Sequence, residues 1–364
     1  MNILYISNLS NTISAGPSWS VPESVKAQQK YDNVLWVDCN AYAYQKHWSD
    51  VEAYHNIKEY KSPFRISNLK EPFNKPDLIV FEGFYHQYGL KIAKEARCLN
   101  IPYIIIPRGS LTCKAQNNHS WLKKRIANFF FYQSFCKHAL LIQYLTKKEF
   151  EDSGLKWCKN YFILPNGFRT PSIVKQKFSS KGIKAIYIGR KDLYHKGLDV
   201  LIDAIYDLKD LLIQNEFKLL LYGPIRDDHD KISDIIKEKG LDEIVENMAE
   251  IGGQAKEQAL LNSDLFILTS RFEGHPMGLI EALAYGLPSL VSTGSNMRNE
   301  IELADAGWCC DTNLSSIKDA LLQIIREKAL FSIKGKKAKE LAANYDWELL
   351  AEKFHYMLLD KLSL

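Results

Sequence analysis

Short apolar runs alternate with longer amphipathic stretches along this chain. Four runs in the first half read NILYIS, NVLWVDC, DLIVFE and YIIIPR, at residues 2–7, 33–39, 77–82 and 103–108. They are β-branched or aromatic and largely apolar on both faces, as strands covered by helices on both sides are. This pattern predicts a mainly parallel, doubly wound α/β sheet.

The alternation begins again in the second half, with strand-like runs at residues 185–190, 218–223, 264–270 and 288–293. Between the halves, Asn166-Gly167 is a strong turn signal, followed by a polar stretch without strong periodicity. We therefore expect two domains, residues 1–165 and 166–345, each with its own doubly wound sheet. The last stretch, residues 346–364, has the apolar spacing of an amphipathic helix.

The run at residues 264–270 is followed by a loop and helix that carry two glutamates, Glu273 and Glu281. Ligands of α/β sheets bind at such strand ends. Pro276 suits the first turn of a helix, where its missing N–H costs nothing. Free backbone N–H groups at a positively polarised helix start bind anions, and glycines allow close approach. We expect these donors from His275, Met277, Gly278 and Leu279, with Gly274 and Gly278 as the glycines.

Ionised carboxylates beside a phosphate would repel it unless they faced neutral hydroxyls, such as the vicinal diols of sugars. A phosphate between two sugars, with one carboxylate for each, describes a nucleotide-sugar. A second strand exit, at residues 189–197, offers Arg190 and Lys196 as a clamp for a diphosphate. The alternative is that Glu273 is a solvated loop residue, Glu281 a helix surface charge, and both cations ordinary surface groups.

Three motifs then carry a family resemblance. GR…KG, F-E-G-x-P-x-x-x-x-E-A-x-A-x-G-x-P and ILPNG together resemble the retaining GT-B glycosyltransferases of the E-x7-E type, often called glycosyltransferase family 4. The resemblance covers most of the chain and is most specific in its C-terminal half, while IIPRGSL resembles the acceptor domain of bacterial polysaccharide enzymes. It implies two Rossmann-like domains facing a central cleft, with the C-terminal helix crossing back to the N-terminal domain.

The resemblance also implies an activity, the transfer of a sugar from a UDP or GDP donor to a hydroxyl with retention of anomeric configuration. Arg190 and Lys196 would bind the diphosphate, Glu281 the ribose hydroxyls, and Glu273 would lie by the donor sugar. Glu273, Arg190 and Lys196 are thus the candidate catalytic residues. The implied donor site consists of Gly189, Arg190, Lys196, Glu273, Gly274, His275, Pro276, Met277, Gly278, Leu279 and Glu281.

No cofactor or metal is expected, because the cations and the helix start would take the place of the metal ion that other glycosyltransferases need. Asp228-His229-Asp230 does match the D-x-D pattern of metal-dependent enzymes of another fold. It lies in a charged loop, however, where such residues are usually solvated.

The N-terminal half departs from the family pattern. Many members carry His-Gly where this chain has Arg108-Gly109, and the Gly-rich loop is reduced to Gly16 and Pro17. Either Arg108 takes over the contact to the donor sugar or sugar recognition has shifted. The acceptor is expected in this domain, near residues 14–20 and 82–86. The candidate residues are Gly16, Trp19, Tyr85, His86, Arg108 and Asn166, of which Trp19, Tyr85 and His86 suit simple packing equally well.

Charge is unevenly distributed although the net charge is only +4, because residues 96–148 contain no Asp or Glu. Within this stretch, residues 114–140 mix Lys and Arg with aromatic residues, a pattern that suits an anionic membrane surface. A core helix with a basic polar side is equally compatible, and nucleic acid is a weaker alternative. A membrane contact would favour a lipid-linked oligosaccharide acceptor, as in capsule, lipopolysaccharide O-antigen or exopolysaccharide assembly.

The seven cysteines are scattered, and neither a secretory leader nor a spanning apolar run is recognisable. We expect a cytoplasmic protein, peripheral at the inner face of the membrane if the basic stretch binds lipid. Hydrolase, P-loop and nicotinamide-binding motifs are absent from the sequence. Two alternatives stay open: a nucleotide-sugar 2-epimerase of the same architecture, and a scaffold that binds a nucleotide-sugar without catalysis.

Overall fold

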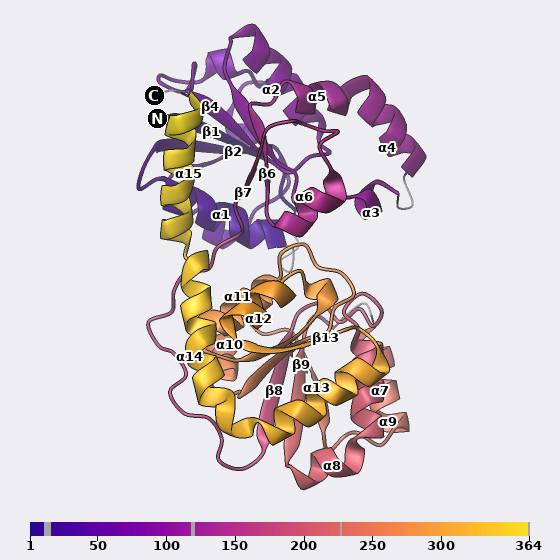
Figure 1. Cartoon of the computed structure of the whole chain (residues 1–364). Coiled ribbons are helices and arrows are strands. Elements are labelled where there is room, and N and C mark those ends of the chain that lie inside the picture. Colours follow the sequence, from indigo (N-terminus) through magenta and orange to yellow (C-terminus); the bar gives the residue numbers. More distant parts are fainter. Residues whose placement is uncertain (11–15, 118–120, 226–227, 363–364) are drawn as a thin grey trace. The chain divides into compact units, whose positions relative to one another are not determined.

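The computed structural model of the chain describes residues 1–10, 16–117, 121–225 and 228–362. It divides into two compact units, Met1–Gly167 with Trp347–Leu364, and Phe168–Asp346 (Figure 1). The chain thus leaves the first unit after Gly167 and returns to it at Trp347. Asn166 and Gly167, which we expected to open the second domain, belong to the first unit.

The first unit is built on a seven-stranded parallel sheet in the order β3-β2-β1-β4-β5-β6-β7. Its strands are β1 (Asn2–Ser7), β2 (Asn33–Asp38), β3 (Tyr54–Asn56), β4 (Leu78–Glu82), β5 (Tyr103–Ile106), β6 (Leu141–Tyr144) and β7 (Tyr161–Ile163). The four predicted strands correspond to β1, β2, β4 and β5. The strands β3, β6 and β7 were not predicted, and β3 and β7 have only three residues each, too few to show a period.

Helices cover both faces of this sheet, so successive residues of β1 enter different cores. Ile3 and Tyr5 pack in one cluster, and Leu4 and Ile6 in the other. The helices are α1 (Gly16–Gln28), α2 (Gln87–Cys98), α3 (Cys113–Gln116), α4 (Trp121–Ala127), the π-helical turn η4 (Asn128–Tyr132), α5 (Gln133–Lys137), α6 (Lys147–Ser153) and α15 (Trp347–Leu362), with 3₁₀ turns at Lys46–Trp48, Ile57–Glu59 and Ile66–Asn68. This two-sided covering explains the apolar runs.

The second unit has a six-stranded parallel sheet in the order β10-β9-β8-β11-β12-β13. Its strands are β8 (Ile183–Ile188), β9 (Phe217–Tyr222), β10 (Val245–Met248), β11 (Leu265–Leu268), β12 (Ser289–Ser292) and β13 (Gly307–Cys310). Its helices are α7 (Leu198–Asp207), α8 (Lys209–Gln214), α9 (His229–Glu238), α10 (Gly253–Leu261), α11 (Met277–Ala284), α12 (Arg298–Ala304), α13 (Leu314–Arg326) and α14 (Phe331–Ala342), with 3₁₀ turns at Thr293–Ser295, Lys328–Leu330 and Ala343–Tyr345. Because β8 and β11 are neighbours, the loops that follow them meet at one edge of the sheet.

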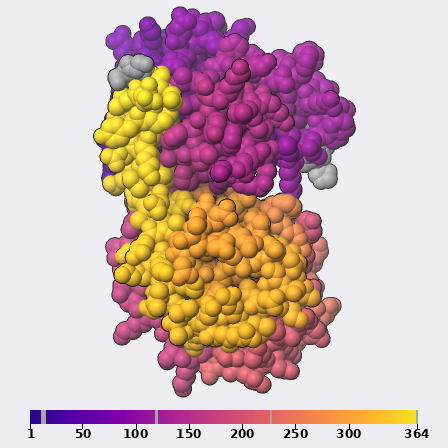
Figure 2. Space-filling model, in the orientation of Figure 1, coloured from indigo at the N-terminus to yellow at the C-terminus, as the bar shows by residue number. Residues whose placement is uncertain are grey.

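The C-terminal helix α15 packs on the first unit, as the resemblance implied (Figure 1, Figure 2). Its buried side chains, among them Trp347, Leu350 and Phe354, join the cluster that also contains Ile3 and Tyr5. The ring of Trp347 lies against Gly167, where even a methyl group would come within 2.5 Å of it. Within the part of the chain that the structure describes, no helix is long and apolar enough to cross a bilayer.

Replacing Trp347 with Ala is expected to destabilise the first unit by about 3–5 kcal/mol, the usual cost of removing a large buried aromatic side chain. Chemical denaturation followed by circular dichroism measures the change. The control is Tyr356→Ala on the same helix, where the exposed side chain predicts a change within about 0.5 kcal/mol. Equal stabilities of the two variants would contradict the packing of α15.

Candidate functional site

The helix α11 begins directly after the eight-residue loop 269–276 that leaves β11. Pro276 is the residue just before the first helical turn, one position earlier than predicted. Among the described residues, the N–H groups of Met277 and Gly278 have no hydrogen-bond acceptor, whereas the N–H of Leu279 donates to the carbonyl of Pro276 at 3.0 Å. The prediction that Leu279 offers a free donor is therefore wrong. The helix start still presents unpaired donors and positive polarity.

The two glycines near this helix start have different roles. A side chain at Gly278 would come within 3.0 Å of the carbonyl oxygen of Ile188, so this glycine lets α11 pack on the end of β8. Nothing lies within 4 Å of the corresponding position at Gly274. Gly278 thus brings the helix start next to the residues that follow β8, and Gly274 faces open space.

The two predicted cations leave β8 in the loop before α7. Gly189 opens this loop, and the hydroxyl of Tyr187 donates to the carbonyl of Arg190 at 2.5 Å. The side chain of Arg190 is exposed and makes no hydrogen bond or ion pair with any described residue. Lys196 instead donates to Oε1 of Glu273 at 2.7 Å.

This ion pair depends on a close backbone approach. Gly197 has φ +63°, and a side chain there would come within 2.1 Å of the carbonyl oxygen of Thr269. Only glycine tolerates that approach, which places the neighbouring Lys196 beside the loop after β11. Ser270 also donates to Oε1 of Glu273, at 2.5 Å, and the amide of Asn296 donates to the backbone carbonyls of Glu273 and Gly274.

Glu281, on α11, pairs with a lysine that the sequence did not single out. Lys256 of α10 donates to its Oε1 at 2.8 Å. Burial raises the pKa of Glu281, and the charge of Lys256 opposes that shift. The side chains of Glu273 and Glu281 are only 11% and 12% exposed. The alternative of two solvated glutamates is therefore wrong.

Burial changes the pKa values of two further groups near this edge, His275 and Lys191. His275 keeps some exposed surface, but its Nδ1 atom is inaccessible and has no described partner. Burial lowers the pKa of His275 to about 3, so its ring is neutral at physiological pH. Lys191 is fully buried, and its ammonium group contacts Asn247 Oδ1 at 2.8 Å and the carbonyl of Met248 at 2.6 Å. Burial lowers the pKa of Lys191 to about 8.

Two residues of the D-x-D pattern, Asp228 and His229, contact the loop that follows β8. Nδ1 of His229 lies 2.5 Å from the ammonium of Lys191, and Asp228 accepts from the N–H of Leu193 at 3.0 Å. Asp228 also accepts from Lys231, which helps to lower its pKa. In the described parts of the chain, no three or more His, Cys, Asp or Glu side chains are grouped to hold a metal ion.

In the first unit, Arg108 is an internal anchor. Its Nε donates to Glu82 at 2.8 Å, and Nη1 donates to Ser20 at 2.9 Å and to Asn166 at 3.1 Å. The side chains of Arg108 and Glu82 are 10% and 0% exposed. The hydrogen bonds of Arg108 are therefore made inside its own unit. One of them links Asn166 to that unit.

The other acceptor candidates divide into packed and exposed residues. His86 is buried, and its Nδ1 accepts from the N–H of Gly89 at 3.2 Å, so its predicted role facing a sugar is not supported by its position. The hydroxyl of Tyr85 lies within hydrogen-bond distance of Gln116 and Asn128. Trp19 is half exposed and stacks on His47, and Gly16, at the start of α1, is exposed. Ser14 and Ala15 of the predicted loop lie outside the described residues.

A comparison with protein-family models identifies the second unit. Residues 169–345, almost the whole unit, match the model named Glycosyl transferases group 1. This segment belongs to that family. The group 1 domain contains both predicted cations and both glutamates.

Curated relatives match part of the chain. Mannosylfructose-phosphate synthase of Agrobacterium fabrum is 27% identical over 157 residues, 39% of this chain and 34% of the relative. Phosphatidyl-myo-inositol mannosyltransferase of Mycobacterium leprae is 24% identical over 195 residues, 52% of this chain and 50% of the relative. The matches thus span half or less of these relatives.

Solved structures match the chain over its whole length. Sucrose-phosphate synthase of Thermosynechococcus elongatus superposes with a TM-score of 0.72 at 15% identity, covering 100% of this chain and 99% of that one. HepE of Anabaena in complex with UDP and glucose gives 0.71 at 16% identity, covering 99% and 100%. These similarities confirm the predicted GT-B fold of two Rossmann-like α/β domains.

Replacing Arg108 with Ala is expected to destabilise the first unit by about 3–5 kcal/mol, because it leaves the buried carboxylate of Glu82 unpaired. Urea denaturation measures the loss. The matched control is the double variant Glu82→Leu, Arg108→Met, which removes both charges and should lose much less. If the single variant is as stable as the parent protein, the anchoring role is wrong.

Proposed function

We propose that this protein is a glycosyltransferase that moves a sugar from a nucleoside diphosphate to a hydroxyl group of a saccharide acceptor. The observation that carries the proposal is the convergence of four groups at one sheet edge: the N–H donors of α11 and Arg190, both without a partner among the described residues, the Lys196–Glu273 pair and Glu281. The first two groups attract a diphosphate. The carboxylates supply acceptors for hydroxyls on either side of it.

The comparisons support this function. The group 1 domain coincides with the unit that holds this site. HepE was solved in complex with UDP and with UDP-glucose. The curated relatives are named as a synthase of mannosylfructose phosphate and a mannosyltransferase. We therefore propose a UDP or GDP sugar as the donor, to be identified by thermal-shift screening with nucleotides and nucleotide-sugars.

The paired carboxylates fit the requirement that acids near a phosphate must not repel it. Glu273 and Glu281 each form an ion pair with a lysine, so neither presents an uncompensated negative charge. Arg190 then adds positive charge on the side of β8. Lys196 has further N–H donors that can contact a diphosphate while one stays on Glu273.

In the proposed sugar transfer, the nucleoside diphosphate is the leaving group. The bond between the anomeric carbon and the diphosphate oxygen breaks, and a bond to the acceptor oxygen forms on the same face, with retention of configuration. The acceptor proton passes to a phosphate oxygen. Arg190, Lys196 and the start of α11 stabilise the charge on the leaving group, so no metal ion is required.

Arg190→Ala and Lys196→Ala are each expected to lower turnover about 10²–10³-fold, the usual effect of removing one preorganised electrostatic donor. Coupled assays of nucleotide release, with melting temperatures for folding, measure the effect. Lys237→Ala, which removes an exposed cation from α9, is the control and should stay near the parent activity.

The same assay tests the chemistry. We expect full activity in excess chelator and an NMR product with the anomeric configuration of the donor, and no isomer of the donor sugar when the acceptor is omitted. Near-normal turnover of either variant would refute the roles of Arg190 and Lys196. Isomerisation without an acceptor would favour an epimerase.

We further propose that residues 114–140 bind an anionic membrane surface and that the acceptor is lipid-linked, as in surface polysaccharide biosynthesis. Of this range, residues 118–120 lie outside the described residues. The remaining part exposes large apolar side chains beside cations: Trp121, Leu122, Ile126, Phe129, Phe130 and Phe131. Exposed aromatic residues flanked by Lys and Arg suit the membrane interface.

Phosphatidylcholine vesicles that contain phosphatidylglycerol should sediment the protein, and vesicles of phosphatidylcholine alone should sediment much less. The triple variant Phe129→Ser, Phe130→Ser, Phe131→Ser should lose this binding, because it removes the apolar part of the contact. A matched variant, Leu303→Ser in the second unit, also removes an exposed apolar side chain and should keep it. Negligible binding of the parent protein to both kinds of vesicle would exclude the membrane contact.

A further inference from the structure

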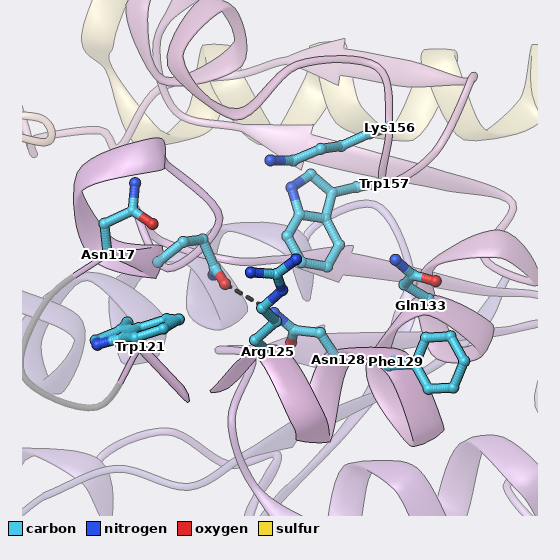
Figure 3. Close-up of a pocket in the computed structure, with 9 residues that line it drawn as sticks. Asn117, Trp121, Arg125, Asn128, Phe129, Gln133, Lys156 and Trp157 are labelled. Carbon is cyan, nitrogen blue, oxygen red and sulfur yellow. Dashed lines mark hydrogen bonds between the residues drawn. The ribbon is translucent and has the colours of Figure 1, made fainter. Parts of the chain in front are cut away.

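A cavity of about 440 Å³ lies in the first unit, lined by the end of α3, by α4 and η4, and by the segment before β7 (Figure 3). Its volume is in the range of small-molecule sites. It lies outside the group 1 domain and contains none of the donor-site residues. The cavity therefore needs an explanation of its own.

Two cations from different segments line this cavity, Arg125 of α4 and Lys156 of the loop between α6 and β7. Figure 3 shows the guanidinium group and the ammonium group directed into the same space. Neither cation pairs with a carboxylate among the described residues, and no Asp or Glu is part of the lining. Two like charges that share a cavity repel each other, so an anion between them is favoured. The planar fork of Arg125 matches the oxygens of a phosphate group.

The remaining walls are aromatic side chains and amides. Trp157 is buried, with the ammonium of Lys156 5.6 Å from its ring centroid, whereas Trp121 and Phe129 are 50% and 71% exposed. Amides such as Gln133 donate and accept hydrogen bonds, as sugar hydroxyls require. A ligand that carries only phosphate would leave the aromatic walls in water. The lining therefore suits a phosphate joined to a sugar and to an apolar group.

The π-helical turn η4 accounts for this combination of a polar floor and an apolar rim. Turns of this kind are rare and are frequently found at functional sites. Asn128 stays inside, where its amide donates to Gln116 Oε1 at 2.8 Å, the dashed line in Figure 3, and its Oδ1 lies 2.9 Å from the hydroxyl of Tyr85. The next three residues, Phe129, Phe130 and Phe131, are exposed at the edge.

We propose that this cavity binds the phosphate or diphosphate group of a lipid-linked saccharide. This inference rests on the proposed function, because it assigns the cavity to the acceptor of that reaction. Arg125 and Lys156 hold the phosphate, the amides contact the adjoining sugar, and the lipid chain leaves past Trp121 and the exposed phenylalanines. The cavity thereby selects a phosphate-bearing acceptor over a free saccharide.

The test is the binding of geranyl diphosphate, a soluble prenyl diphosphate, measured by calorimetry. The Arg190→Ala protein serves as the parent, so that the proposed donor site competes little. Adding Arg125→Gln or Lys156→Gln should weaken binding about tenfold or more, the effect of losing a charge-assisted hydrogen bond. Adding Lys123→Gln is the control, because it removes an equal charge from the same helix at an exposed residue that, unlike the exposed Arg125, does not line the cavity. Screening predicts less than about a twofold change there.

Three results would overturn the proposal: unchanged binding in both cavity variants, equal weakening in all three variants, or inorganic diphosphate that binds as tightly as geranyl diphosphate. The last result would identify a site for free phosphate. Melting temperatures check folding, and Arg125→Lys, which keeps the charge but loses the fork, should bind with intermediate affinity.

The outcome is separable from that of the proposed function. Binding of geranyl diphosphate needs no donor and no turnover. Failure of the protein to transfer sugar from any nucleotide-sugar, together with loss of binding in the cavity variants, would refute the function and leave the cavity as a prenyl-phosphate site. Sugar transfer together with unchanged binding in the cavity variants would refute the cavity alone.

Discussion

The ion pair between Lys196 and Glu273 is the contact on which the proposed site depends. It joins the loop after β8 to the loop after β11, two strands that are neighbours in the sheet. The pair is enforced by the backbone, because Gly197 approaches the carbonyl of Thr269 more closely than any side chain allows. Gly278 packs the start of α11 on the end of β8 in the same way. Two glycines thus bring the cations, the carboxylate and the helix start to one edge.

The distribution of charge follows from this arrangement. Lys196 and Lys256 each compensate one glutamate, while Arg190 and the first N–H groups of α11 remain unpaired among the described residues. The edge is therefore attractive to an anion in spite of two largely buried acids. A phosphate could bind Arg190 and these N–H groups without breaking either lysine–glutamate pair. His275 adds no positive charge, because burial keeps its ring neutral.

Much of this could be predicted from the sequence, because it depends on local patterns. Apolar runs bounded by helical stretches indicated two parallel sheets, and the E-x7-E spacing with Gly-Arg and Lys-Gly located the candidate donor residues. Contacts between residues far apart in the sequence could not be predicted. Nothing in the sequence around Lys256 indicates that it pairs with Glu281. The sequence around Lys191 likewise gives no sign that its ammonium group is buried against Asn247 and Met248. Arg108 was a candidate contact to the donor sugar, and its ion pair with Glu82 of β4 could not be predicted because the two residues are far apart in the sequence.

The central claim is that a diphosphate is held between the start of α11 and the cations that follow β8. A crystal structure of the protein with UDP tests it most directly. We expect phosphate oxygens within about 3 Å of the N–H groups of Met277 and Gly278 and of a side-chain nitrogen of Arg190 or Lys196, with Glu281 on the ribose. Phosphates bound elsewhere, or facing neither the helix start nor the two cations, would contradict the account.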